Sequence, residues 1–371
     1  MRWLCLALVA LGACKRPAAL EPRDAGLVPG QARAVKPAPP APSLQHAALA
    51  ELHDAGWRLA WISERSGAPQ VVVDGVEVTS GPAAHYLGAV VAGGAGFIVT
   101  AVEGGQEELR WVLPDAGVRV LAPSSLRARH PSLPADGRFV VFESGVGGLS
   151  RLERVELGDG GVGTLADEPT GVFEPSVAPD GAWLVYVSSR EGDSELYRAA
   201  IDGSRAQRLT AFHLEDFGPR VSPDGRWIAF LSNREGFDRV FLVRPDGRGQ
   251  RRLISSDWHG PASHDAGPVE AGEQDVAWAP DSCRVALAAR TAGDHWHLLT
   301  VDVATGVATV LSAGAWDDHQ PAFSPDGKFL AFVSTRGGSP EVWLMRPDGG
   351  VTQVSADGAP DWRPMFVRWW P

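Results

Sequence analysis

A seven-residue motif recurs along the chain and limits what the chain can fold into. Its clearest copies are residues 175–181, 219–225 and 321–327, which all end in Pro-Asp-Gly, and weaker copies are residues 131–137 and 276–282. In Ser-Pro-Asp-Gly, proline presets φ for a turn, aspartate hydrogen-bonds nearby backbone amides and glycine accepts a left-handed conformation. The motif therefore predicts a tight hairpin turn at each copy.

Each turn is followed by a run of short apolar segments. After the copy at 219–225, residues 227–231 read Trp-Ile-Ala-Phe-Leu, which is apolar on both faces and typical of a strand buried between neighbouring sheets. A second strand at 239–244 and a third ending near Leu253 follow, separated by polar turns. Together with the strand before the motif, each unit predicts four antiparallel strands.

The motif aspartates mark the period of the repeat. They lie 44, 44, 57 and 45 residues apart and are Asp136, Asp180, Asp224, Asp281 and Asp326. Equal steps back from the first marker reach two degenerate units, whose apolar strands are residues 97–102 and 57–63. The chain thus holds seven units of about the length of a four-stranded propeller blade.

We therefore predict an all-β fold: a single β-propeller over residues 44–371 with seven four-stranded blades, with six or eight blades as the alternatives. Residues 360–370 read as one more first strand with no unit after it. Because pairing of the two chain ends removes an exposed sheet edge, we expect residues 365–369 to complete the blade that begins at Trp57.

These repeats resemble the TolB-type, WD40-like propeller repeat, through the Ser-Pro-Asp-Gly turn and the aromatic strand after it. The same repeat occurs in the propellers of prolyl-oligopeptidase-like enzymes and oligogalacturonate lyases. The resemblance implies a propeller, and it implies a scaffold that binds proteins in the cell envelope as one function. TolB itself has an α/β domain before its propeller, whereas a proline-rich segment stands there in this chain.

The N-terminus has the pattern of a bacterial export signal. An arginine and the apolar residues 3–13 precede Cys14, and this stretch is too short for a permanent membrane span. Residues 11–14, Leu-Gly-Ala-Cys, resemble the bacterial lipobox, which implies a lipid on the cysteine. The alternative is an ordinary secretory signal cleaved near Ala13 or Ala19.

We accordingly expect residues 1–13 to be a lipoprotein signal peptide and residues 14–43 a tether. The tether is rich in proline and alanine and is expected to be extended and semi-rigid. The residue after Cys14 is Lys15, not aspartate, which resembles outer-membrane sorting in enterobacterial lipoproteins. We therefore expect an outer-membrane lipoprotein whose propeller faces the periplasm.

Charge and motifs exclude some functions. A net charge of −11 argues against nucleic acid as a partner, because phosphate contacts need clustered lysine and arginine. The chain has no Gly-x-Ser-x-Gly elbow of a serine hydrolase. Residues 158–163 match Gly-x-Gly-x-x-Gly, but they lie between two strands and are read as a hairpin turn.

Polar residues recur six positions before the marker aspartates. These positions are His130, Glu174, Gly218, Asp275 and Gln320, and His319 is adjacent to the last. If they line the entrance of a central channel, they form a polar and acidic ring. We predict a candidate channel-mouth binding site, for a cation or a basic peptide segment, at His130, Glu174, Asp275, His319 and Gln320. The alternative is that they are solvated strand starts.

The long step between the third and fourth markers reflects an insertion at residues 255–274. It contains Trp258 and His259, and long loops on a rigid scaffold often carry recognition. These two residues are candidate loop-binding residues. A flexible insertion without a role is the alternative.

The sequence favours a monomeric, non-enzymatic scaffold that binds an envelope protein or peptide segment, with no cofactor and no catalytic residue assigned. The acidic balance suggests that the partner's segment is neutral or basic. The alternative is a saccharide- or peptide-binding protein, or a metal-dependent enzyme like the oligogalacturonate lyases, with its site at the channel mouth.

Overall fold

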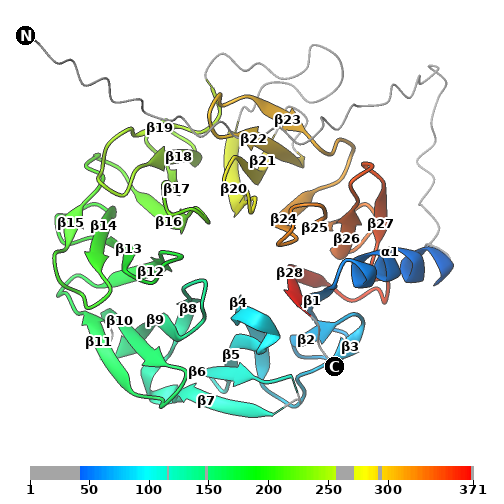
Figure 1. Ribbon diagram of the computed structural model, residues 1–371, viewed down its shortest axis with the longest axis horizontal. Helices are drawn as coiled ribbons and strands as arrows, with labels where there is room; N and C mark the ends of the chain where they lie inside the picture. The colour runs from blue at the N-terminus through cyan, green and yellow to red at the C-terminus, as the bar shows by residue number, and fades with distance from the viewer. Residues whose placement is uncertain (1–41, 115–116, 147–148, 256–270, 291–294, 369–371) are drawn as a thin grey trace, which may run out of the picture.

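The computed structural model describes residues 42–114, 117–146, 149–255, 271–290 and 295–368. These residues form seven four-stranded antiparallel sheets arranged as a ring, with one α-helix outside it (Figure 1). The prediction of an all-β, seven-bladed propeller is confirmed.

Each blade has four strand positions. From blade 1 to blade 7, the innermost strands are β28 (Asp361–Arg368), β4 (Ala84–Val90), β8 (Arg129–Ser132), β12 (Val172–Val177), β16 (Asp216–Val221), β20 (Ala271–Trp278) and β24 (Asp318–Phe323). The second strands are β1 (Trp57–Ser63), β5 (Phe97–Glu103), β9 (Phe139–Val146), β13 (Trp183–Ser188), β17 (Ile228–Ser232), β21 (Arg284–Arg290) and β25 (Leu330–Ser334). The third strands are β2 (Gln70–Val73), β6 (Gln106–Val112), β10 (Leu149–Glu156), β14 (Glu195–Ala200), β18 (Arg239–Val243), β22 (Trp296–Asp302) and β26 (Glu341–Met345). The outermost strands are β3 (Val76–Glu77), β7 (Val118–Ala122), β11 (Val162–Ala166), β15 (Gln207–Arg208), β19 (Arg251–Arg252), β23 (Ala308–Val310) and β27 (Val351–Gln353). Two short 3-10 turns are η1 (Ala92–Gly94) and η2 (Ser124–Leu126).

The two ends of the propeller meet in blade 1. Strand β28 pairs antiparallel with β1, with Leu59 opposite Phe366 and Ser63 opposite Asp361. The last strand of the chain is therefore the innermost strand of the first blade, and the predicted closure is confirmed. Each other blade is built from four consecutive strands.

The repeated turn has the predicted chemistry. In blade 5, Asp224 accepts hydrogen bonds from the Ser222 hydroxyl (2.6 Å) and the Arg226 amide (3.0 Å), and Gly225 has φ +69°. The Gly225 N–H donates to the Ser222 carbonyl at 2.9 Å. This turn joins the innermost strand to the second strand, so it fixes where each innermost strand lies relative to the axis.

The core of the protein lies between blades. Seven hydrophobic clusters are present among the described residues, and each joins two neighbouring blades. Strand β17 shows the principle: Ile228 and Phe230 pack toward blade 4, whereas Ala229 packs toward blade 6. The second strands are thus apolar on both faces because each contributes to two clusters.

One helix, α1 (Pro42–Asp54), was not predicted. It ends at Asp54, and Gly56 just beyond it has φ +82° and donates its N–H to the His53 carbonyl. Ala48 and Leu52, one turn apart, are buried against blades 1 and 7, beside the closing sheet (Figure 1). The propeller domain therefore begins with a helix that covers the junction where the ring closes.

Candidate binding channel

Each innermost strand contains a β-bulge at one level of the ring. In blade 4, Phe173 pairs with Val187 and Ser176 pairs with Val185, so Glu174 and Pro175 share a single opposing residue. A bulge of this kind bends the strand and re-aims a side chain. In six blades the first bulged residue has a left-handed φ of +49° to +61°, and these residues are His130, Glu174, Gly218, Asp275, Gln320 and Arg363.

These six residues line one open channel along the axis of the ring. The channel has a volume of about 1350 Å³ and also takes wall residues from blade 2, where Gly88 occupies the equivalent bulge. A Cβ at Gly88 would lie 2.2 Å from Cγ of Pro131, so a side chain has no room there. The structure places four of the predicted residues, His130, Glu174, Asp275 and Gln320, in the channel wall.

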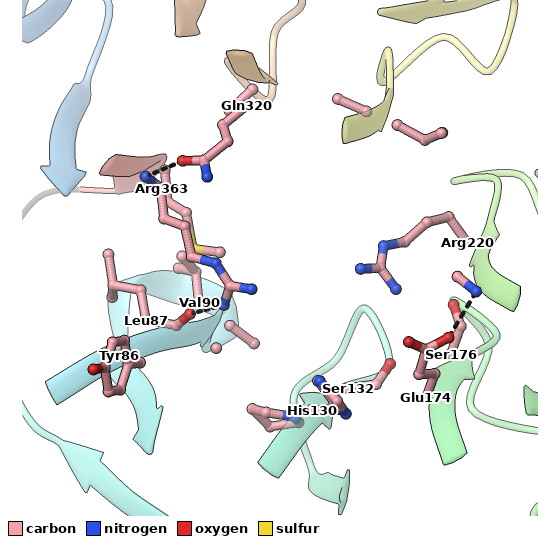
Figure 2. A pocket seen from close by; sticks show the side chains of 18 of the residues that line it. Tyr86, Leu87, Val90, His130, Ser132, Glu174, Ser176, Arg220, Gln320 and Arg363 are labelled. Carbon is pink, nitrogen blue, oxygen red and sulfur yellow. Dashed lines mark hydrogen bonds between the residues drawn. The ribbon is translucent and has the colours of Figure 1, made fainter. Parts of the chain in front are cut away.

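The bulged residues are joined from blade to blade by hydrogen bonds. Oε2 of Glu174 accepts from the Gly218 amide (2.7 Å), and Oδ2 of Asp275 accepts from the Gln320 amide (3.1 Å). Oε1 of Gln320 accepts from the Arg363 amide (2.7 Å), and the Arg363 side chain donates to a carbonyl of blade 2 (Figure 2). These polar residues therefore hold neighbouring blades together, which the sequence did not reveal.

Glu143 is a second link, between blades 3 and 4. Its Oε2 lies 2.9 Å from Nδ1 of His130 and accepts a hydrogen bond from the Glu174 amide (3.3 Å). Burial raises the pKa of Glu143, but the bond and charge of His130, together with bonds from the Glu174 amide and Ser150, outweigh burial and hold the pKa below its ordinary value. The carboxylate thus stays charged and fixes the His130 ring.

His319, the fifth predicted channel residue, does not line the cavity. Its Nδ1 lies 3.1 Å from the Gln274 side chain and 3.5 Å from Oδ2 of Asp275, and its ring lies 5.5 Å from the Trp296 ring. It therefore packs between blades 6 and 7, behind Asp275. Its contacts position the channel wall.

Three arginines of the wall were missed by the sequence analysis. Arg129, Arg220 and Arg363 all line the channel, and Figure 2 shows the side chains of Arg220 and Arg363 extending into it from opposite sides. A signal for Arg363 existed, because it precedes Pro364 as Glu174 precedes Pro175. Arg220 had no such signal.

The arginines change the electrostatics of the channel. The Arg220 side chain is exposed to the cavity and lies deep within the ring. Desolvation by the surrounding protein lowers the pKa of Arg220; the charge of Glu174 opposes this shift and the charge of Arg363 adds to it. An arginine remains charged under all ordinary conditions. The channel therefore presents positive groups beside Glu174 and Asp275, and is mixed in charge, not uniformly acidic.

Other predicted residues lie outside the part of the chain that the structure describes. These are Cys14, the proposed lipid site, and Trp258 and His259, the candidate loop-binding residues. Their roles stay predictions.

Comparison with known proteins places the fold. No protein-family model matches this chain. An uncharacterized protein of Agrobacterium fabrum is 34% identical over 70 residues, which are 19% of this chain and 24% of that protein, so the match spans about a quarter of the relative's length.

Solved structures similar to this chain include proteins of several kinds. TolB from Acinetobacter baumannii has 16% identity and a TM-score of 0.54, over 84% of this chain and 66% of that chain. An oligogalacturonate lyase in complex with manganese has 15% identity and a TM-score of 0.61, over 79% and 86%. A puromycin-hydrolyzing peptidase of Mycobacterium tuberculosis has 17% identity and a TM-score of 0.60, over 84% and 55%. At these identities the likeness establishes a TolB-type propeller fold, and fold alone does not assign function.

Among the described residues, no helix is long and apolar enough to cross a lipid bilayer.

Proposed function

We propose that this protein is a lipid-anchored scaffold of the bacterial cell envelope, whose propeller binds a segment of another protein at the channel mouth. The observation that carries the proposal is the channel itself. It is open, about 1350 Å³ in volume, and lined by charged side chains of several blades. Pockets with a few convergent polar groups on a rigid frame are typical recognition sites.

The channel wall is suited to recognition because it is held in place before a partner arrives. The hydrogen bonds of Glu174, Asp275 and Gln320 join successive blades and fix the wall. Such pre-organisation lowers the ordering cost of binding. The guanidinium groups of the wall then provide the contacts to a partner.

The charges of the channel refine the kind of partner. Arg129, Arg220 and Arg363 face the cavity, and arginine binds carboxylates with two parallel hydrogen bonds. We propose that the bound segment places an acidic side chain or a C-terminal carboxylate between Arg220 and Arg363. This proposal departs from the expectation of a neutral or basic contacting segment, because the channel wall carries arginines although the chain as a whole is acidic.

The test is a crosslinking pull-down from the native envelope with matched variants. Arg220→Ala removes a channel charge, and Arg226→Ala removes a charge from a side chain that is 78% exposed and does not line the channel. We expect one protein captured reproducibly by the native chain and by Arg226→Ala, and at least tenfold less of it with Arg220→Ala. Absence of any reproducible partner, or equal capture by both variants, would contradict the proposal.

The lipid anchor is tested separately. We propose that Cys14 carries the lipid and that the segment after it spaces the propeller from the membrane. Metabolic labelling with a fatty acid is expected to label the native chain, and Cys14→Ala is expected to lose both the label and the membrane fraction. Unchanged labelling of that variant rules out this cysteine as the lipid site.

A metal-dependent enzyme is the competing function. Within the described part of the chain, no three metal-ligating side chains converge in the channel, and the rings of His130 and His319 already contact Glu143 and Gln274. Metal analysis separates the two functions. Loss of a stoichiometric metal in both Glu174→Ala and His319→Ala favours the enzyme. A metal content that is the same in the native chain and in both variants favours the scaffold.

A further inference from the structure

Three carboxylates converge where blade 7 meets blade 1. They belong to Glu341 at the start of β26, Asp361 at the start of β28 and Asp357 in the segment before β28, and their ligand atoms lie within 4.8 Å of one another. Glu341 and Asp361 are buried, whereas the side chain of Asp357 is 32% exposed. We name these three residues the junction cluster.

The junction between blades 4 and 5 has the same framework and serves as an internal comparison. There Glu195 begins β14 and Asp216 begins β16, and both are fully buried. The Asp216 amide donates to the Ser194 carbonyl at 2.8 Å, as the Asp361 amide donates to the Pro340 carbonyl at 2.8 Å. The two buried carboxylates therefore occupy equivalent places in the two junctions.

Two arginines neutralise the carboxylates of the junction between blades 4 and 5. Nη2 of Arg208 lies 2.7 Å from Oε1 of Glu195. Nη2 of Arg234 donates to both oxygens of Asp216, at 2.9 and 2.8 Å. Buried charges are normally paired in this way, because burial of an unpaired ion is costly.

Among the described residues around the junction cluster, no arginine takes the place of either Arg208 or Arg234. Arg208 pairs with Tyr197 in its sheet, and the residue that pairs with the corresponding Trp343 is Gln353. Arg65 stands two residues after Ser63, as Arg234 stands two residues after Ser232. Its guanidinium group, however, makes no contact with Asp361. Its Nε donates to Glu77 at 3.0 Å and its Nη2 to a backbone carbonyl at 2.9 Å.

The consequence, within the described ranges of the chain, is a buried carboxyl group without a counterion. Both oxygens of Asp361 are buried and accept no hydrogen bond of normal geometry from those residues. The hydroxyl of Ser355 is committed to Glu341, to which it donates at 2.8 Å. Arg65 approaches only the outer carboxylate, with Nη1 3.8 Å from Oδ2 of Asp357. Burial raises the pKa of Asp361 to about 7; the nearby Ser355 and Ser63 oppose the rise, and repulsion from Asp357 and Glu341 adds to it.

We propose that the junction cluster binds a divalent cation of the hard, oxygen-seeking class, and that this cation is Ca²⁺. All three ligands are carboxylates, which suit Ca²⁺ and Mg²⁺, and neither histidine nor cysteine is among them. Ca²⁺ accepts irregular sets of several carboxylates, whereas Mg²⁺ demands near-ideal octahedral geometry and keeps most of its water. The partly exposed Asp357 provides the entry side.

The bound cation would replace the two missing arginines at the place where the ring closes. Asp361 is the first residue of β28, the strand that joins the C-terminus to blade 1. Binding that is specific to the folded state raises stability in proportion to the logarithm of the free ligand concentration once the site is nearly saturated. Closure of the propeller is thereby coupled to Ca²⁺.

The experiment uses the full chain after treatment with a chelator. Calorimetric titration with CaCl₂ is expected to give one ion per chain, and Ca²⁺ is expected to raise the thermal unfolding midpoint. Asp361→Asn is expected to abolish binding, and the milder Asp357→Asn to weaken it at least tenfold, which keeps the test valid if the buried variant does not fold. Asp348→Asn, in the exposed turn between β26 and β27, is the matched control and is expected to bind as the native chain does.

Two results would overturn the proposal. One is the absence of both heat and a thermal shift with Ca²⁺, in which case a proton on Asp361 accounts for the buried group. The other is Ca²⁺ binding that survives in a folded Asp361→Asn or Asp357→Asn variant with unchanged affinity. Because the junction cluster does not line the channel, Arg220→Ala is expected to leave Ca²⁺ binding intact, and the outcome is independent of the proposed scaffold function.

Discussion

The carboxylate of Glu174 accepts a 2.7 Å hydrogen bond from the backbone N–H of Gly218, and so ties blade 4 to blade 5 at the channel wall. The two residues occupy equivalent bulges in successive blades, and both have a left-handed φ. For a residue with a side chain this conformation is strained by about 1 to 2 kcal/mol. The hydrogen bonds between blades offset this strain, and the same residues both stabilise the ring and form the channel wall.

Loss of the Glu174 link is expected to weaken the ring. Glu174→Ala leaves the Gly218 amide without its acceptor and is expected to lower the free energy of unfolding by about 1 to 3 kcal/mol. Glu174→Gln keeps a side-chain oxygen of the same reach and is the control, with an expected loss of less than about 1 kcal/mol. Urea unfolding followed by tryptophan fluorescence measures both. Equal losses would show that charge, and not the hydrogen bond, is what matters.

The buried His85 predicts a dependence of stability on pH. Its Nδ1 lies 3.0 Å from Oε1 of Gln70 and its Nε2 faces Nη1 of Arg110 at 3.2 Å, an arrangement that needs a neutral ring. Burial, together with the charge of Arg110, lowers the pKa of His85 from its ordinary value, with a backbone bond at Ala83 in opposition. The unfolded chain takes up a proton near pH 6.5 and the folded chain does not, so stability falls as pH drops below about 6.5.

Urea unfolding at pH 7.5 and pH 5.5 checks this expectation. The native chain is expected to lose more stability between the two values than His85→Gln does. His213→Gln, at an exposed histidine, is expected to behave as the native chain. A His85→Gln chain with the full native loss would place the pH dependence elsewhere.

The buried pair of Arg234 and Asp216 makes a third prediction. Arg234 bonds both oxygens of Asp216, donates to Ser232 at 2.7 Å and lies over the ring of Phe241 at 4.4 Å. Arg234→Ala leaves a fully buried carboxylate uncompensated and is expected to cost about 3 to 5 kcal/mol. The double change Asp216→Asn with Arg234→Ala is expected to cost less than the single change, because no charge remains buried.

A matched exposed pair sets the scale for that experiment. Arg138 and Asp136 lie 3.4 Å apart with side chains more than half exposed, so Arg138→Ala is expected to cost less than about 1 kcal/mol. Denaturant midpoints of the four proteins test the comparison. If the double variant is as unstable as Arg234→Ala, the loss comes from packing of the arginine and not from the stranded carboxylate.

The fold was predictable because the residues that form the repeated turn can be recognised in the sequence. Pro-Asp-Gly occurs at a fixed place in each of the clearest repeats, so a count back from the marker aspartates also located the channel-wall residues Glu174 and Gln320. The count did not reach Arg363, because no further marker follows it. Repetition thus carries positional information only where a complete repeat exists.

Other features of the site depend on geometry that residue types do not encode. The bulges at Glu174 and Gln320 need a left-handed conformation that these residue types rarely adopt, so the links between blades had no local signal. Arg220 lies two residues past the bulge, where blade 4 has Ser176, and only the structure shows that it extends into the channel. Helix α1 was not predicted because, among its residues whose side chains are described, only Ala48 and Leu52 are fully buried, with Leu49 partly buried beside them.

The closing strand makes the last prediction. Phe366 and Val367 of β28 are buried on opposite faces of blade 1, in the clusters shared with blade 7 and with blade 2. A chain that ends at residue 360 loses both, at about 1.5 to 3 kcal/mol each, and leaves β1 as an unpaired edge. We expect that chain to unfold at a lower denaturant concentration and to self-associate, whereas a chain that ends at Arg368 behaves as the native protein.

Light scattering and urea unfolding measure these outcomes, and a monomeric short chain with the native midpoint would show that the ring does not need its closing strand. Recovery on addition of a peptide of residues 361–368 would tie the defect to the missing strand, because such a peptide can pair with the free edge of β1.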